Sequence, residues 1–160
     1  MQPSSARFMG GARNHVGSSM QYVCDAGAAT WFRIETPGEA VIESQAMNHA
    51  VEKFFRDAYD KAAAGYVPPK SLAAFEQRIG LKAHIQRAMP RFLTLRDKDG
   101  TALVTAMLPP EGQDTRTFRP VIVGPANADP YPTQSEAIRK LGDHCRLTLD
   151  PARCYPYRRT

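Results

Sequence analysis

The segment from residue 36 to residue 64 constrains the fold more than any other part of the chain. It opens with Thr36-Pro37-Gly38-Glu39, a capping-box pattern with proline at the first helical position. Gly65 and the Pro68-Pro69 pair mark its end. At about 100° per residue the apolar side chains fall on one side. We therefore predict one long amphipathic helix that packs by one face. That face consists of Ala40, Met47, Ala50, Val51, Phe54, Phe55, Ala58 and Ala62.

Segments with strand character lie on both sides of this helix in the sequence. One hairpin is predicted around the small residues 26–29, and another around Asp97-Lys98-Asp99-Gly100, which favours a tight turn. β-branched and aromatic residues are common in the segments that we assign to strands. Those segments are residues 21–25, 30–35, 92–96, 101–108, 118–124 and 146–149.

Two further helical regions are predicted. Ser71 can cap a helix that carries Phe75 and Ile79, but after Gly80 the apolar positions move to the opposite side. Two helices bent at Gly80 fit this change of phase. Residues 133–136 have the form of a second capping box.

In the helix that this second box begins, Ile138 and Leu141 form the predicted buried side. The complete order is ββ-αα-βββ-α-β. It predicts an α+β fold with a mainly antiparallel sheet of about five to six strands, covered by one long helix and shorter ones.

We assign a single folded domain to residues 20–160, since 42% of the chain is hydrophobic and no repeat or long linker divides it. Residues 1–19 contain no acidic residue and lack the apolar core of a secretory signal. We predict a disordered basic tail; the alternatives are a true start at Met20 and an organellar transit peptide. Residues 151–160 are predicted to form a basic, aromatic C-terminal tail. No apolar run approaches the ~18 residues of a membrane span, so no membrane partner is expected.

The basic side chains are concentrated in blocks. The net charge is +5; residues 71–100 hold six basic and three acidic side chains, and residues 146–160 hold four and one. Blocks that meet on one face attract acidic proteins or nucleic acid. The predicted partner-binding residues are Lys82, Arg87, Arg91, Arg96, Arg153, Tyr155, Tyr157, Arg158 and Arg159.

Motifs for metals, cofactors and catalysis are missing from the sequence. It has no P-loop, no GxGxxG, no GxSxG and no HExxH. Cys24, Cys145 and Cys154 form an odd set without a compact zinc spacing, so we expect free thiols, no metal and no cofactor. His49 is predicted on the solvent side of its helix. Glu43 lies at the edge of the apolar face, where such a residue usually reaches water.

These observations lead to one principal hypothesis and two alternatives. The principal hypothesis is a small, cytoplasmic, non-enzymatic protein that contacts an acidic protein partner through the basic surface. The first alternative is a nucleic-acid-binding protein that uses the same basic face and the Arg/Tyr tail. The second is a small enzyme or ligand-binding protein, with a pocket between the long helix and the sheet that the loops at 109–117 and 127–132 line.

Overall fold

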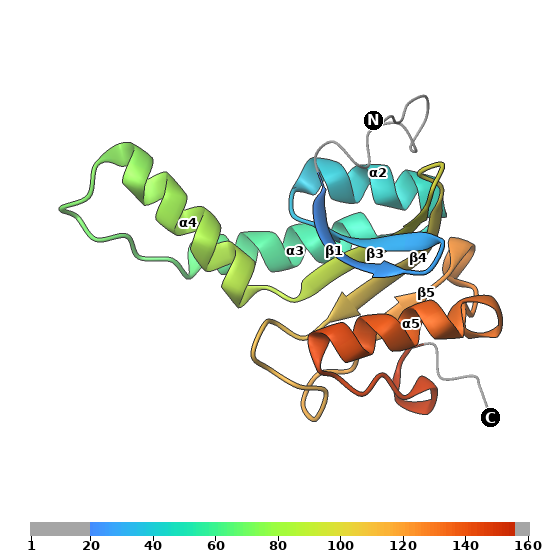
Figure 1. The fold of residues 1–160 in the computed structure, drawn as a ribbon. Coiled ribbons are helices and arrows are strands. Elements are labelled where there is room, and N and C mark those ends of the chain that lie inside the picture. Colours follow the sequence, from blue (N-terminus) through green and yellow to red (C-terminus); the bar gives the residue numbers. More distant parts are fainter. Residues whose placement is uncertain (1–19, 156–160) are drawn as a thin grey trace.

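In the computed structural model, which describes residues 20–155, helices cover both faces of one five-stranded sheet (Figure 1). Neighbouring strands are antiparallel and follow the order of the sequence. Gly27 and Gly100 have positive φ in the two predicted hairpin turns. The predicted α+β class and antiparallel sheet are thus confirmed. The strands are β1 (Gln21–Ala26), β2 (Ala29–Ile34), β3 (Arg91–Asp97), β4 (Ala102–Leu108) and β5 (Val121–Val123).

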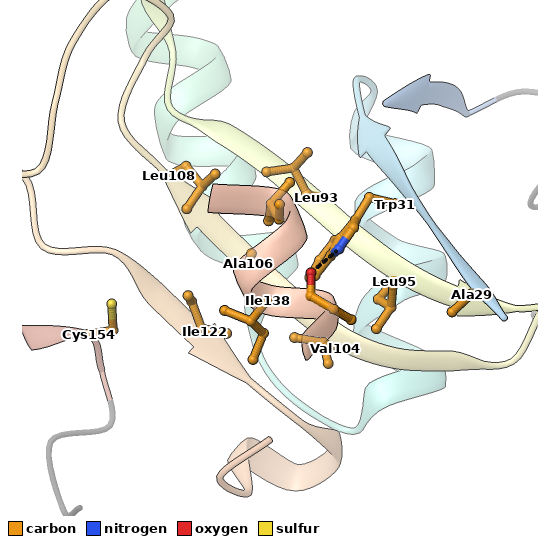
Figure 2. Close-up of a cluster of buried hydrophobic side chains, with 12 residues drawn as sticks. Ala29, Trp31, Leu93, Leu95, Val104, Ala106, Leu108, Ile122, Ile138 and Cys154 are labelled. Carbon is orange, nitrogen blue, oxygen red and sulfur yellow. Dashed lines mark hydrogen bonds between the residues drawn. The ribbon is translucent and has the colours of Figure 1, made fainter. Parts of the chain in front are cut away.

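Helix α5 (Tyr131–Cys145) covers one face of the sheet. Successive strand residues point to opposite faces, so Trp31 and Leu93 both lie on the side of this helix. The indole Nε1 of Trp31 donates a hydrogen bond to the carbonyl oxygen of Ala137 over 2.9 Å (Figure 2). Ile138 and Leu141 are buried here, as the sequence predicts.

Helices α2 (Pro37–Met47) and α3 (Val51–Ala64) cover the opposite face. The aromatic ring of Phe55 meets that of Phe92 edge-on, with ring centroids 5.1 Å apart. The predicted capping box is confirmed at the start of α2, where Thr36 Oγ1 accepts from the Glu39 amide and Glu39 Oε1 accepts from the Thr36 amide.

The prediction of one long helix is wrong. The chain leaves the helix at Asn48, whose φ of 53° and ψ of 55° are left-handed, and enters α3 at Val51. Ser44 Oγ accepts a hydrogen bond from the Glu52 amide over 2.9 Å, so a side chain of α2 caps the start of α3. The break changes the helical phase. As a result Phe54 is 62% exposed although the sequence places it on the buried face.

The predicted bend at Gly80 is also absent, because α4 (Ala74–Ala88) is one continuous helix. A Cβ at Gly80 would lie 2.3 Å from Tyr66 Oη, so this glycine serves close packing rather than a bend. The first half of α4 projects from the body (Figure 1). The two apolar stripes of α4 therefore do not have to pack against the same surface. Phe75 and Ile79 are exposed, and Ile85 is buried.

Two details near the C-terminus also differ from the sequence prediction. Residues 146–149 are not a strand: Leu147 donates from its amide to Gly142 O over 2.8 Å, which turns the chain back along α5. Tyr155 instead forms a parallel bridge with Val121 beside β5. Helix α5 begins at Tyr131 rather than at the predicted Thr133 cap, and Gln134 has a non-helical φ within it.

The remaining elements are two short 3-10 helices, η2 (Pro125–Asn127) and η3 (Pro151–Arg153). No helix in the range 20–155 is long and apolar enough to cross a membrane. The tail predicted at residues 1–19 and the last five residues of the predicted C-terminal tail lie outside the described residues.

Candidate functional site

A cavity of about 390 Å³ lies beside the α2–α3 connection, over β4 and the edge strand β5. The wall is mainly apolar, and its volume falls in the range of small-ligand pockets. Phe54, largely exposed, stands among the lining residues. The apolar lining residues are Ala50, Val51, Phe54, Phe92, Met107, Val121 and Val123, and the polar ones are His49, Thr105, Arg119, Asn127 and Tyr155.

A chain of polar side chains leads from the cavity into the core. His49 Nε2 lies 2.9 Å from Thr105 Oγ1, and the Thr105 hydroxyl donates to Glu43 Oε2. Glu43 Oε1 accepts from Arg96 Nη2 over 2.6 Å. Glu43 and Arg96 are 0% and 1% exposed, so their ion pair is shielded from water. We call His49, Thr105, Glu43 and Arg96 the polar relay.

The hydrogen bonds assign the tautomer of His49. The single hydroxyl proton of Thr105 goes to Glu43, so Thr105 Oγ1 can only accept from His49. Nε2 of His49 therefore carries a proton. Nδ1 accepts from the Val51 amide over 3.4 Å, which is consistent with a neutral ring.

Burial explains the protonation state of His49. Desolvation lowers its pKa below the ordinary value of 6.5, and the nearby Glu43 carboxylate opposes this shift. The ring is therefore neutral near pH 7. A neutral ring places no charge in the apolar wall of the cavity.

Local sequence explains why these residues meet. Thr94 and Arg96 of β3 and Thr105 of β4 occupy alternate positions that face the layer of α2 and α3. Arg96 Nε donates to Thr94 Oγ1 and Nη1 to Gly100 O, both over 3.0 Å. The left-handed turn at Asn48 then brings His49 down onto the sheet.

The Thr105 hydroxyl is not activated as a nucleophile in this arrangement. Thr105 is 3% exposed, its proton points to Glu43, and one lone pair accepts from His49. His49 has both ring nitrogens engaged, so it cannot take a proton from Thr105 in this arrangement. The cavity thus has a mainly apolar wall, and the relay side chains below it are hydrogen-bonded to one another.

Comparison of the chain with protein-family models, with curated proteins and with solved structures finds no match in any of the three. The function is therefore inferred from the geometry of the site.

The structure distributes the predicted partner-binding residues over separate places. Lys82 and Arg87 are exposed on α4, whereas Arg91 is half-buried and donates from Nε to Pro109 O over 2.7 Å. Arg96 belongs to the polar relay and is buried, so it is removed from the predicted contact surface.

The C-terminal members of that set lie elsewhere. Arg153 is exposed on η3, and Tyr155 lines the cavity. Helix α4 and η3 belong to different ends of the molecule (Figure 1). Tyr157, Arg158 and Arg159 lie outside the described residues.

The thiols are free and there is no cluster of metal-ligating side chains within residues 20–155. Burial raises the pKa of Cys24 to about 11, with Cys145 and Asp25 adding to the shift. Burial also raises the pKa of Cys145. Both thiols are therefore protonated at neutral pH, which does not suit a nucleophile.

The sequence prediction missed the principal site residues. It placed His49 in solvent because it ran one helix through Asn48, and it left Glu43 at the rim. The signal for a helix break was the pair Asn48-His49. Asparagine often adopts the left-handed conformation that ends a helix, and a polar side chain follows it. Of the two loops expected at a pocket, Asn127 does line the cavity, and residues 109–117 do not.

Proposed function

We propose that the protein binds a small, mainly apolar organic molecule in the cavity beside His49. The observation that carries this proposal is the lining: apolar side chains from α3, β3, β4 and β5 surround a volume of about 390 Å³, above polar groups that already satisfy one another. An apolar molecule that displaces water from such a wall gains free energy without leaving a buried polar atom unpaired.

The polar lining residues narrow the class of ligand. Arg119, Asn127 and Tyr155 contribute a cation, an amide and a phenol to the lining. They favour a ligand with an apolar body and one polar or anionic end. A purely polar metabolite would leave most of the wall without a matching group.

Fluorescence of anilinonaphthalene sulfonate tests the proposal, because this probe has an apolar aromatic body and one anionic group. We expect saturable binding to the full chain. Val121→Phe fills part of the cavity and should weaken binding about tenfold, the effect of roughly 1.4 kcal/mol. Val67→Phe, the same change at an 86% exposed residue, serves as the matched control.

The outcomes distinguish binding in the cavity from non-specific binding of the dye. Near-ultraviolet circular dichroism must show that each variant keeps fixed tertiary packing, because partly folded proteins also bind this dye. Equal affinities for Val121→Phe, Val67→Phe and the unmodified chain would refute the proposal.

We propose a second function, contact with an acidic protein partner, for the projecting part of α4. Phe75 and Ile79 are 56% and 61% exposed there. With Lys82 they fall within about 60° on the helix, so apolar and basic groups share one face. A partner helix with leucines beside glutamates complements this face in both respects.

Anisotropy of a labelled helical peptide with that pattern tests this second proposal. Lys82→Glu should weaken the binding, and Lys98→Glu, the same change in the exposed β3–β4 turn, should not. Preferential binding of a single-stranded oligonucleotide would favour a nucleic-acid partner instead. Self-association in sedimentation would make the face an interface between copies.

A further inference from the structure

A second hollow, of about 290 Å³, lies on the α5 face of the sheet, next to the C-terminal end of that helix. It is unlike the first because its lining includes three arginines. Arg33 comes from β2, Arg91 from β3, and His144 and Arg146 from the end of α5. Glu111, in the segment after β4, is the one acidic side chain of this lining.

Strand register brings two of the arginines together. Arg33 is paired with Leu93 across β2 and β3, and Arg91 precedes Leu93 by two positions. Residues two apart on a strand point to the same face, so both guanidinium groups continue the row that Trp31 and Leu93 begin in the core.

Each of these two guanidinium groups is held by one hydrogen bond to a backbone carbonyl. Arg33 Nη2 donates to Gln86 O over 2.7 Å, and Arg91 Nε donates to Pro109 O over 2.7 Å. Neither guanidinium makes another hydrogen bond within residues 20–155. A guanidinium has five N–H donors, so most of their donors remain available.

Arg33 is a desolvated cation with charges of both signs nearby. Burial is the largest influence on its pKa and lowers it. The carboxylates of Glu35 and Glu111 oppose this shift, and the positive charge of Arg91 adds a smaller lowering. An anion bound beside Arg33 therefore compensates a cation that burial has deprived of water.

We propose that this hollow binds the oxyanion of a small molecule, a phosphoryl or carboxylate group, between Arg33 and Arg91. The fork of N–H donors on each guanidinium matches the oxygen pairs of such a group. Arg146 extends the positive lining toward solvent, and His144, Gln21 and Tyr22 add polar groups.

Glu111 is the internal competitor for this place. It is exposed and belongs to a loop segment, so it can be displaced by an anion of higher charge. We therefore expect a polyanion such as pyrophosphate or tricarballylate to bind more tightly than a monoanion. This site does not depend on the proposed apolar ligand, because the two cavities lie on opposite faces of the sheet.

Isothermal titration calorimetry on the full chain, at constant ionic strength, tests the inference. Pyrophosphate and tricarballylate are the probes, and their relative affinities distinguish a phosphoryl from a carboxylate ligand. Arg91→Gln should weaken the tighter probe about tenfold, since it removes charge-assisted hydrogen bonds. Arg87→Gln, the same change on exposed α4, should leave the affinity within about twofold.

Further variants keep the test decisive. Arg91→Lys retains the charge without the fork, so an affinity close to that of Arg91→Gln supports bidentate contact. If Arg91→Gln does not fold, Arg146→Gln at the exposed rim should still weaken binding about threefold. Absence of binding by both probes, or an equal loss in Arg87→Gln, would overturn the inference.

Discussion

The buried ion pair of Glu43 and Arg96 provides the sharpest test of how the core is built. Replacing Arg96 with methionine leaves the Glu43 carboxylate without its cation at a place that is 0% exposed. It also removes the bonds that Arg96 makes to Thr94 Oγ1 and Gly100 O. Removal of one member of a buried pair costs about 3–5 kcal/mol.

That cost is large for a chain of this size. Typical free energies of unfolding are about 5–15 kcal/mol. A loss of 3–5 kcal/mol corresponds to a decrease in Tm of roughly 6–20 °C. Glu43→Gln keeps the shape of the side chain but leaves Arg96 as a buried, uncompensated cation, so we expect a loss of the same order.

The double variant Glu43→Gln/Arg96→Met separates charge from packing. It contains no buried ion, so its loss should be smaller than the sum of the single losses by about 1.5–3 kcal/mol. Urea unfolding monitored by Trp31 fluorescence measures all four proteins, with equal m-values as the condition for comparison. Additive losses would refute the argument that the two residues stabilise the core as a pair.

Three further predictions concern other parts of the molecule. Because burial lowers the pKa of His49, the unfolded chain takes up a proton on this ring before the folded chain does as pH falls below about 6.5. The free energy of unfolding should therefore decrease there more in the unmodified protein than in His49→Gln, and parallel pH profiles of the two proteins would contradict this. Gly142→Ala places a Cβ 2.8 Å from Leu147 O and should lower Tm. The Cβ of Gly112→Ala has no atom within 4 Å, so this variant should act only through the positive φ of residue 112 and lower Tm less. Thermal melts that rank the two variants in the reverse order would be inconsistent with the packing. Cys24, with its pKa raised to about 11, should react with iodoacetamide at pH 8 far more slowly in the folded than in the urea-unfolded chain, as mass spectrometry of its peptide measures; equal rates would show an open thiol.

The sequence predicted the strand–turn–strand regions well because their signals are local. The Asp97–Gly100 turn and the Gly27 hairpin need only turn residues between apolar segments, and the Thr36 capping box needs only four neighbours. The structure has these features where the sequence places them. Local chemistry was sufficient there.

The errors in the fold arise where a distant contact decides. The sequence predicts a bend at Gly80, but in the structure the missing side chain of Gly80 leaves room for the Tyr66 side chain. Residues 146–149 have strand composition, but the turn after Gly142 directs them along α5. Neither Tyr66 nor Gly142 gives a signal at those positions, so no local pattern could have corrected the prediction.

The candidate site depends on the same kind of contact. A periodicity argument treats His49 as a solvent-facing residue. Asn48 is the sequence signal for the helix break, and the hydrogen bond from the Glu52 amide to Ser44 Oγ shows the break in the structure. Arg96 reads as one member of a basic block, yet its partner Glu43 is 53 residues away in the chain. Charge composition therefore indicates how many arginines a block has, and burial determines which of them can meet a partner.

Intermolecular nuclear Overhauser effects measure the occupancy of the His49 cavity most directly. With methyl-labelled valine and methionine, protons of anilinonaphthalene sulfonate should give contacts to the methyl groups of Val51, Met107 and Val121. The methyl groups of Val67, on the loop before α4, should give none. Contacts that are strongest at Val67, or absent from all three cavity residues while the dye is bound, would contradict the account.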